Sequence, residues 1–243
     1  MDSLTAIAAS GLRARMESLE LLANNVANAS TDGYKADREF YSLYTAPEAQ
    51  DADPLSTMPV IERPWTDLAQ GSMQVTGNPL DLALAGGGFF VVQGPNGPLY
   101  TRNGKFHLSA KGKLVTADGY PVGAAGGGSL TLDPTRPIAV AADGTASQDG
   151  QAAGQLQVAA LAPGGFVKQG ANYFRASDPQ APAGAPSGIS VEQGKLEASN
   201  TGTAESAVRL VSVMRQFEML QKAVSLGADM NRQAIEQVAK VGT

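Results

Sequence analysis

The sequence contains no cysteine, and this absence excludes disulfides, thiolate-bound zinc and cysteine nucleophiles together. It has only one histidine, so a multi-histidine metal site is excluded as well. Basic residues number 18 against 23 acidic ones, and the resulting net charge of −5 argues against nucleic-acid binding. No apolar run approaches the roughly 18 residues that a membrane span needs. The sequence therefore predicts neither a nucleic-acid partner nor membrane insertion.

The first twenty residues, MDSLTAIAASGLRARMESLE, carry scattered charges where a secretory signal has a basic start and an apolar block. We therefore expect export, if it occurs, without a cleaved signal peptide. Aromatic residues make up only 6% of the chain, whereas its 28 glycines concentrate in the middle. That distribution indicates a β structure rich in turns.

The N-terminal residues 3–28 have the pattern of a helix. Apolar residues recur at three- and four-residue intervals and predict one continuous face, formed by Leu12, Met16, Leu19, Leu22 and Val26. The segment from Asn28 to Gly33 contains residue types that compete with helix or tolerate a left-handed backbone. We expect a turn shaped by Asn28, Gly33 and Tyr34, with a positive φ at Gly33.

The middle of the chain has the pattern of short strands joined by tight turns. Alternation or continuous apolar runs predict strands at 80–84, 89–92, 129–132, 138–141, 155–161 and 173–175. Asn-Gly and Asp-Gly steps between these runs are strong hairpin signals. Four prolines between residues 45 and 65 indicate an extended connector before this region, and residues 177–188 are typical of a flexible linker.

The last forty residues return to a helical pattern without proline. Five consecutive heptads place mainly apolar residues at two positions in seven, with Gly227 and Asn231 as the exceptions. The first of these positions are Leu210, Val213, Phe217, Leu220 and Val224. At 1.5 Å per residue, a helix over 204–241 is about 57 Å long, which is more than a domain of this size needs. The ten apolar positions of the two helices are our predicted assembly interface. Pairing of the two helices within one monomer is the alternative that the pattern leaves open.

Together these features predict an α+β fold. Long N- and C-terminal helices, coiled-coil-like, flank an inserted all-β domain rich in hairpins. The predicted divisions are an N-terminal assembly helix and turn (1–35), an extended connector (36–67), a β-rich domain (68–188) and a C-terminal strand, turn and assembly helix (189–243).

No combination of residues predicts catalysis, a cofactor or a metal ion. His107 lies in a predicted strand, and a half-exposed strand residue explains it better than a general base does. The glycine triplets at 86–88 and 126–128 precede no helical pattern, so they indicate turns and not phosphate cradles. Asp32, Asp37 and Glu39 lie close in sequence, but so loose a cluster does not by itself indicate a metal site.

Several blocks of the chain do match a known pattern. They are Ala23–Ala36 (ANNVANASTDGYKA), Thr76–Leu84 (TGNPLDLAL) with Gly87–Val92 (GGFFVV), Tyr100–Phe106 (YTRNGKF) with Leu114–Val122 (LVTADGYPV), and Gln193–Asn200 (QGKLEASN). In content and order they resemble the signature segments of flagellar rod and hook proteins. The segment Thr201–Val208 departs from the hydrophobic entry that the family commonly has after its SN dipeptide.

The resemblance implies a structural subunit of the flagellar basal-body rod. Such subunits assemble with copies of themselves and other rod proteins into a helical tube that transmits torque. The resemblance also implies that the subunits are exported through the flagellum's own export apparatus, and that the tube they form crosses the periplasm. Within the family, the short middle region and the segment Arg215–Met219 look most similar to the proximal-rod subunit, with the distal rod as the alternative.

Two other classes of protein are alternatives to this interpretation. A non-flagellar extracellular structural protein, such as an adhesin, could share the helix–β–helix order but not the four blocks. An enzyme with a carboxylate site in the β domain is the second rival, and its candidate residues are Asp81, Asp118, Asp133 and Asp143. All four lie in turn or strand contexts that explain them without catalysis.

Overall fold

The structure is a computed structural model of the chain, and it describes residues 3–39, 41–45, 57–61, 64–161, 164–170, 172–178 and 188–241. The chain divides into two compact units. We call the first the helical unit; it comprises Met1–Ala27, Asp37–Thr66 and Gly202–Thr243. We call the second the β unit; it comprises Asn28–Ala36 and Asp67–Thr201.

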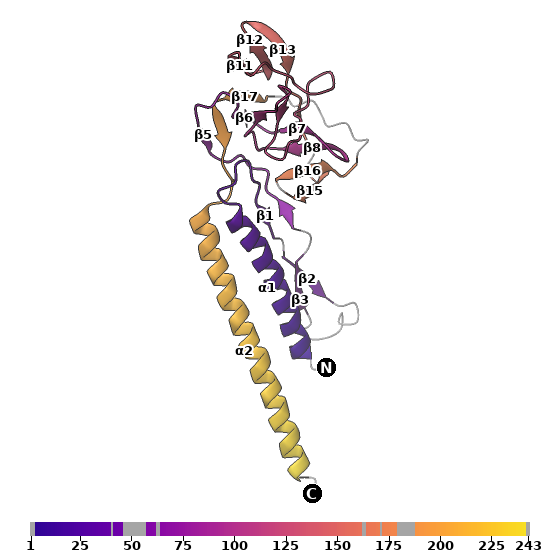
Figure 1. The fold of residues 1–243 in the computed structure, drawn as a ribbon. Helices are drawn as coiled ribbons and strands as arrows, with labels where there is room; N and C mark the ends of the chain where they lie inside the picture. Colours follow the sequence, from indigo (N-terminus) through magenta and orange to yellow (C-terminus); the bar gives the residue numbers. More distant parts are fainter. Residues whose placement is uncertain are drawn as a thin grey trace. The chain divides into compact units, whose positions relative to one another are not determined.

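The helical unit is built on the two helices that the sequence predicts. Helix α1 spans Ser3–Ala27 and helix α2 spans Thr203–Val241. The two helices pack side by side, and α2 continues well past the N-terminal end of α1 (Figure 1). Neither helix, within the described part of the chain, has an apolar stretch of the length that crossing a bilayer requires.

The segment predicted to be an extended connector contains paired strands. Strand β2 (Tyr41–Thr45) pairs antiparallel with β3 (Thr57–Ile61), which packs against α1, and β1 (Asp37–Arg38) pairs with β4 (Trp65–Thr66). Pro59 lies opposite Leu43 in the β2–β3 pair, and β2 is the only partner of β3 among the described strands. A proline is tolerated there because an edge strand does not need every N–H. The described residues of this segment are thus extended, as predicted, but they also pair into strands, which its proline content did not indicate.

The β unit is a set of small antiparallel sheets. Its largest sheet has the order β14-β7-β8-β16-β15. The strands of that sheet are Phe89–Gly94 (β7), Gly97–Thr101 (β8), Val158–Ala159 (β14), Phe166–Gly170 (β15) and Tyr173–Ala176 (β16). A three-stranded sheet joins β11 (Ile138–Val140), β12 (Thr145–Gln148) and β13 (Gln151–Gln155). Three two-stranded pairs complete the unit: β5 (Met73–Val75) with β18 (Lys195–Glu197), β6 (Leu82–Ala85) with β17 (Ser190–Gln193), and β9 (His107–Leu108) with β10 (Leu114–Val115).

Strand β7 is buried on both faces, as its continuous apolar sequence predicts. Phe90 and Val92 belong to the main core cluster, whereas Phe89 and Val91 belong to a second cluster. Phe90 meets the edge of Phe106 at 5.1 Å between ring centroids, and Phe89 meets Phe174 at 5.3 Å. Because successive side chains of a strand point to opposite faces, one apolar run supplies both clusters.

Two strand predictions were only partly right. Residues 129–132 form isolated bridges instead of a strand, although Leu130 and Leu132 are buried in the main core. The predicted strand 155–161 is divided between the end of β13 and β14. The Asp149-Gly150 turn has positive φ at both residues, as the hairpin signal predicts. Most of the predicted linker, residues 179–187, lies outside the described residues.

Candidate assembly interface

Most of the predicted interface residues are buried or half-buried within the chain. Leu22 and Val213 are the most buried of them, each 6% exposed. Leu220 reaches α1 closely, since its Cδ1 lies 3.8 Å from where a Cβ on Gly11 would stand. Seven others are half-buried: Leu12, Leu19, Val26, Leu210, Phe217, Leu220 and Val224. The exception is Met16, which is 52% exposed.

A second apolar stripe runs along α2 and is exposed. It comprises Val208, Val211, Met219, Leu226 and Met230, and we call it the outer stripe. Phe217, on the face that packs against α1, is nine residues from both Val208 and Leu226, about two and a half helical turns. The outer stripe therefore lies on the opposite side of α2 from the intramolecular contact. The sequence did not predict it, although the intervals of three, eight, seven and four residues between its members all fit one helical face.

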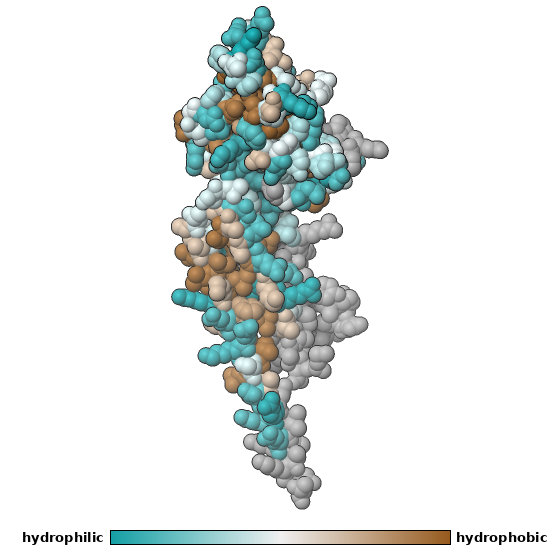
Figure 2. All heavy atoms as spheres, in the orientation of Figure 1, coloured by the Kyte–Doolittle hydropathy of each residue, from teal (hydrophilic) through white to brown (hydrophobic). Residues whose placement is uncertain are grey.

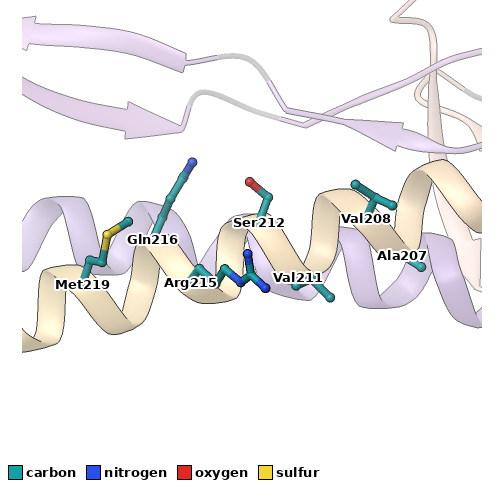
Figure 3. Close-up of a pocket in the computed structure, with 7 residues that line it drawn as sticks. All are labelled: Ala207, Val208, Val211, Ser212, Arg215, Gln216 and Met219. Atoms are coloured by element: carbon teal, nitrogen blue, oxygen red, sulfur yellow. The ribbon is translucent and has the colours of Figure 1, made fainter.

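The N-terminal half of the outer stripe lines a shallow groove. Its described lining residues are Ala207, Val208, Val211, Ser212, Arg215, Gln216 and Met219. Figure 3 shows these side chains along α2, with α1 behind it. Figure 2 shows hydrophobic residues gathered over the first turns of α2. Arg215 is the one charged residue among these described lining residues.

The predicted turn after α1 is embedded in the β unit. Gly33 has a φ of +68°, as expected from the sequence, and a Cβ on it would lie 2.4 Å from the backbone of Arg102 and Asn103. Asn28 accepts hydrogen bonds from the backbone N–H and the hydroxyl of Thr31. Tyr34 is buried, and the Lys168 ammonium lies 4.6 Å from its ring centroid. All three residues predicted to shape the turn therefore hold it in place.

A buried ion cluster, which the sequence did not predict, lies beside this turn. The Glu197 carboxylate accepts hydrogen bonds from Lys35 Nζ at 2.5 Å and from Arg102 Nη1 at 3.0 Å. All three side chains are almost completely buried. The cations also donate to backbone carbonyls, Lys35 to Ala69 and Arg102 to Leu84 and Gly86. Burial lowers the pKa of Lys35 below its ordinary value, although the contact with Glu197 opposes that shift.

The carboxylates proposed for the rival enzyme each have a local structural partner. Asp118 accepts from the Tyr173 hydroxyl at 2.7 Å, and Asp81 accepts from the Asn78 amide at 3.0 Å. Asp133 and Asp143 each bond the residue two positions on, Thr135 and Thr145, and these bonds lower their pKa values. The described residues contain no group of three potential ligands that could hold a metal ion.

Replacing Tyr173 with phenylalanine is expected to flatten the loss of stability at alkaline pH. Burial, and to a lesser degree the bond to Asp118, raises the pKa of Tyr173 well above its ordinary value. Above about pH 10 the unfolded chain therefore releases a proton that the folded chain retains, so stability falls as pH rises. Tyr173→Phe should cost about 1 kcal/mol at neutral pH and less above pH 10.

The measurement is the free energy of unfolding of the wild type and the variant from pH 7 to 11. The lowered pKa of Lys35 gives the opposite slope, but it is present in both proteins and cancels in the difference. A difference between the two proteins that stays constant across pH 10 would contradict the assignment.

Comparison with protein families and known proteins agrees with this architecture. Residues 6–35 match the family model "Flagella basal body rod protein", residues 83–151 match the D1 domain of the flagellar hook protein FlgE/F/G, and residues 192–237 match the C-terminal region of flagellar basal body rod FlgEFG proteins. The chain is 33% identical to the flagellar basal-body rod protein FlgF of Caulobacter vibrioides, over 99% of this chain and all of that protein. This chain belongs to the flagellar basal-body rod protein family.

Other relatives support the same assignment. The FlgF protein of Mesorhizobium japonicum is 31% identical, with 97% of each chain covered. A FlgG rod protein, from Agrobacterium fabrum, is 33% identical over 93% of this chain and 95% of its own length. The chain is thus a structural rod protein, most like FlgF. The matched regions at 6–35 and 192–237 include most of α1, most of α2 and the segments next to them, where the candidate interface lies.

Proposed function

We propose that the chain assembles with other rod proteins and with copies of itself through the outer stripe of α2. The assembly is a helical tube that transmits torque, and the chain reaches the periplasm through the flagellar export apparatus without a cleaved signal. The subunit acts by assembly and performs no catalysis. The observation that carries this proposal is that α2 has two apolar faces, and among the described residues only one of them is covered.

The length of α2 supports the same conclusion. It has 39 residues against 25 in α1, which gives lengths of about 58 Å and 37 Å. Side chains toward its C-terminal end, such as Leu226 and Met230, are 62% and 63% exposed. Isolated helices are marginal in water, so a long helix with exposed apolar residues is stabilised by packing against partners. In a rod, neighbouring subunits supply those partners.

Burial of the exposed apolar surface supplies a driving force for assembly. Burying a Val, Leu or Met side chain fully is worth roughly 1.5–3 kcal/mol. The five residues of the outer stripe are 49% to 72% exposed. An intermolecular contact that buries them would therefore gain a large part of that free energy for each residue. A tube repeats the contact in every subunit, which allows individually modest contacts to hold it together. We propose a position in the proximal rod, and the similarity to FlgF proteins supports this proposal.

Substituting the outer stripe tests this function. The variant Val211→Asp/Met219→Asp is expected to leave the monomer's melting temperature nearly unchanged, because both side chains are already largely exposed. It should abolish incorporation into basal bodies, and with it swimming, in a strain that lacks the wild-type gene. Gln221→Asp, at an exposed position of α2 outside the stripe, is the matched control. Normal rods and normal swimming with the double variant would refute the outer stripe as the interface.

A further inference from the structure

The β unit includes the segment that directly follows α1 and the segment that directly precedes α2. Asn28–Ala36 follows α1 directly and belongs to the β unit, whereas Asp37 returns to the helical unit. At the other end, β18 (Lys195–Glu197) and the residues up to Thr201 belong to the β unit, and Gly202 begins the helical unit. We call 28–36 the entry segment and 195–201 the exit segment.

Hydrogen bonds join the entry and exit segments directly to each other within the β unit. The Gly33 N–H donates to the Glu197 carbonyl at 2.6 Å, and the Asn200 N–H donates to the Tyr34 carbonyl at 3.3 Å. The Asn200 side chain accepts from the Ala36 N–H at 2.8 Å. Its amide also donates to the carbonyls of Asp67 at 2.7 Å and Ala69 at 3.1 Å. Asn200 thus holds the last residue of the entry segment together with the segment from Asp67 to Ala69, where the chain re-enters the β unit.

The Glu197 carboxylate joins the same two segments through their side chains. It accepts from Lys35 of the entry segment, from Arg102 and from the Gly71 N–H at 2.9 Å. One buried anion therefore serves two buried cations and one backbone donor. Removing one partner of a buried ion pair is costly because the remaining charge has no solvent. Loss of Glu197 leaves two such charges, whereas loss of Lys35 leaves the Arg102–Glu197 pair intact.

We propose that Glu197 and Asn200 form a clamp that makes the entry and exit segments open and close as one cooperative element. Both are positioning residues, since they act on the segments that lead into α1 and α2 and touch no partner themselves. The clamp follows from the contacts within the β unit alone. The clamp has a consequence for a rod, which rests on the proposed function. A force applied to either helix would reach the β unit through the entry and exit segments that the clamp holds together.

Native-state hydrogen exchange on the full chain tests the clamp. In the wild type, the amides of Gly33 and Ala36 are expected to share one opening free energy with those of Gly71 and Asn200. In Glu197→Gln, all four should lose protection together, by about 100-fold or more. The amides of Val91 and Val122, which bond Gln157 and Leu114 in the core, should lose far less.

The control is Lys35→Met, which keeps the length of the side chain and removes one cation. It should reduce the protection of Gly33 and Ala36 by less than about 10-fold and leave Gly71 unchanged, because Arg102 still neutralises Glu197. If Glu197→Gln does not fold, Asn200→Ala makes the same comparison without leaving a buried charge unpaired. It removes only the hydrogen bonds of the Asn200 side chain to Ala36, Asp67 and Ala69.

Two outcomes would overturn the clamp. One is independent exchange of the entry and exit amides in the wild type. The other is an equal loss of protection in the core amides of the variants, which would make the cluster an ordinary part of the core. Neither outcome depends on rod assembly, so failure of the clamp is distinguishable from failure of the proposed function. Conversely, a chain that exchanges as predicted but forms rods without its outer stripe would refute only the latter.

Discussion

Gly33→Ala is expected to lower the free energy of unfolding of the β unit by about 3–5 kcal/mol, from two additive sources. The first is the backbone conformation, because φ is +68° and an L side chain is strained there by roughly 1–2 kcal/mol. The second is steric. The new Cβ would lie 2.4 Å from Arg102 C and Asn103 N and 2.6 Å from the Arg102 carbonyl oxygen. Backbone atoms cannot move aside as a flexible side chain can, so the entry segment must shift away from its bonds to Glu197.

Gly77 provides a matched control for this prediction. Its φ is +74°, close to that of Gly33, but a Cβ there would have no atom within 4 Å. Gly77→Ala should therefore cost only the conformational part, about 1–2 kcal/mol. Urea unfolding of both variants, followed by a probe of the β unit, measures the difference. Equal costs at the two positions would show that the close approach of the Arg102 backbone is not a constraint.

The parts of the fold that the sequence predicted well are those with a local signal. Helix α1 ends at Ala27 because the residues that follow favour turns, and α2 runs without proline for 39 residues. Strand β7 is continuous and apolar because both its faces are buried. The turn at Asp149-Gly150 needs two residues that tolerate positive φ. In each case the cause lies within a few residues of its effect.

The parts that could not be predicted depend on contacts between distant residues. Lys35 and Glu197 are 162 positions apart, and neither belongs to a periodic pattern that would mark it as buried. A lysine and a glutamate are usually exposed, so composition predicts the opposite of what the structure shows. The β2–β3 hairpin was missed for a related reason. Its pairing depends on a partner strand that begins 12 residues after β2 ends, with proline in the second strand.

The candidate interface shows a different limit. A heptad pattern identifies the apolar face of α2, but it does not say whether α1 of the same chain or another molecule covers that face. The structure shows that α1 contacts it, and so favours the alternative that the sequence left open for these residues. Whether they also contact other subunits stays a prediction. The exposed apolar residues on the opposite face, from Val208 to Met230, are the surface that we propose for assembly.

Val213→Asp is expected to separate the two faces of α2, because it places a charge on the covered one. Val213 is 6% exposed and lies on the side toward α1, whereas Val211, two residues earlier, is 49% exposed on the outer stripe. An uncompensated carboxylate at Val213, together with the lost apolar burial, should cost about 3–4 kcal/mol. The described part of the helical unit consists of two helices and short strand pairs, which offer little to offset such a loss, so the α1–α2 packing should be lost.

Val211→Asp, the same substitution on the exposed face, is the comparison for Val213→Asp. Circular dichroism melting of the purified chain should show a lower helical transition in Val213→Asp and an unchanged one in Val211→Asp. Incorporation into basal bodies should fail when Val211→Asp is combined with Met219→Asp, even though that monomer remains fully helical. Val213→Asp should also fail to assemble, but only as a consequence of its unfolded helices. If Val213→Asp kept its helical transition and lost assembly, the buried face would be an intermolecular contact, and the division of α2 into a covered and an outer face would be wrong.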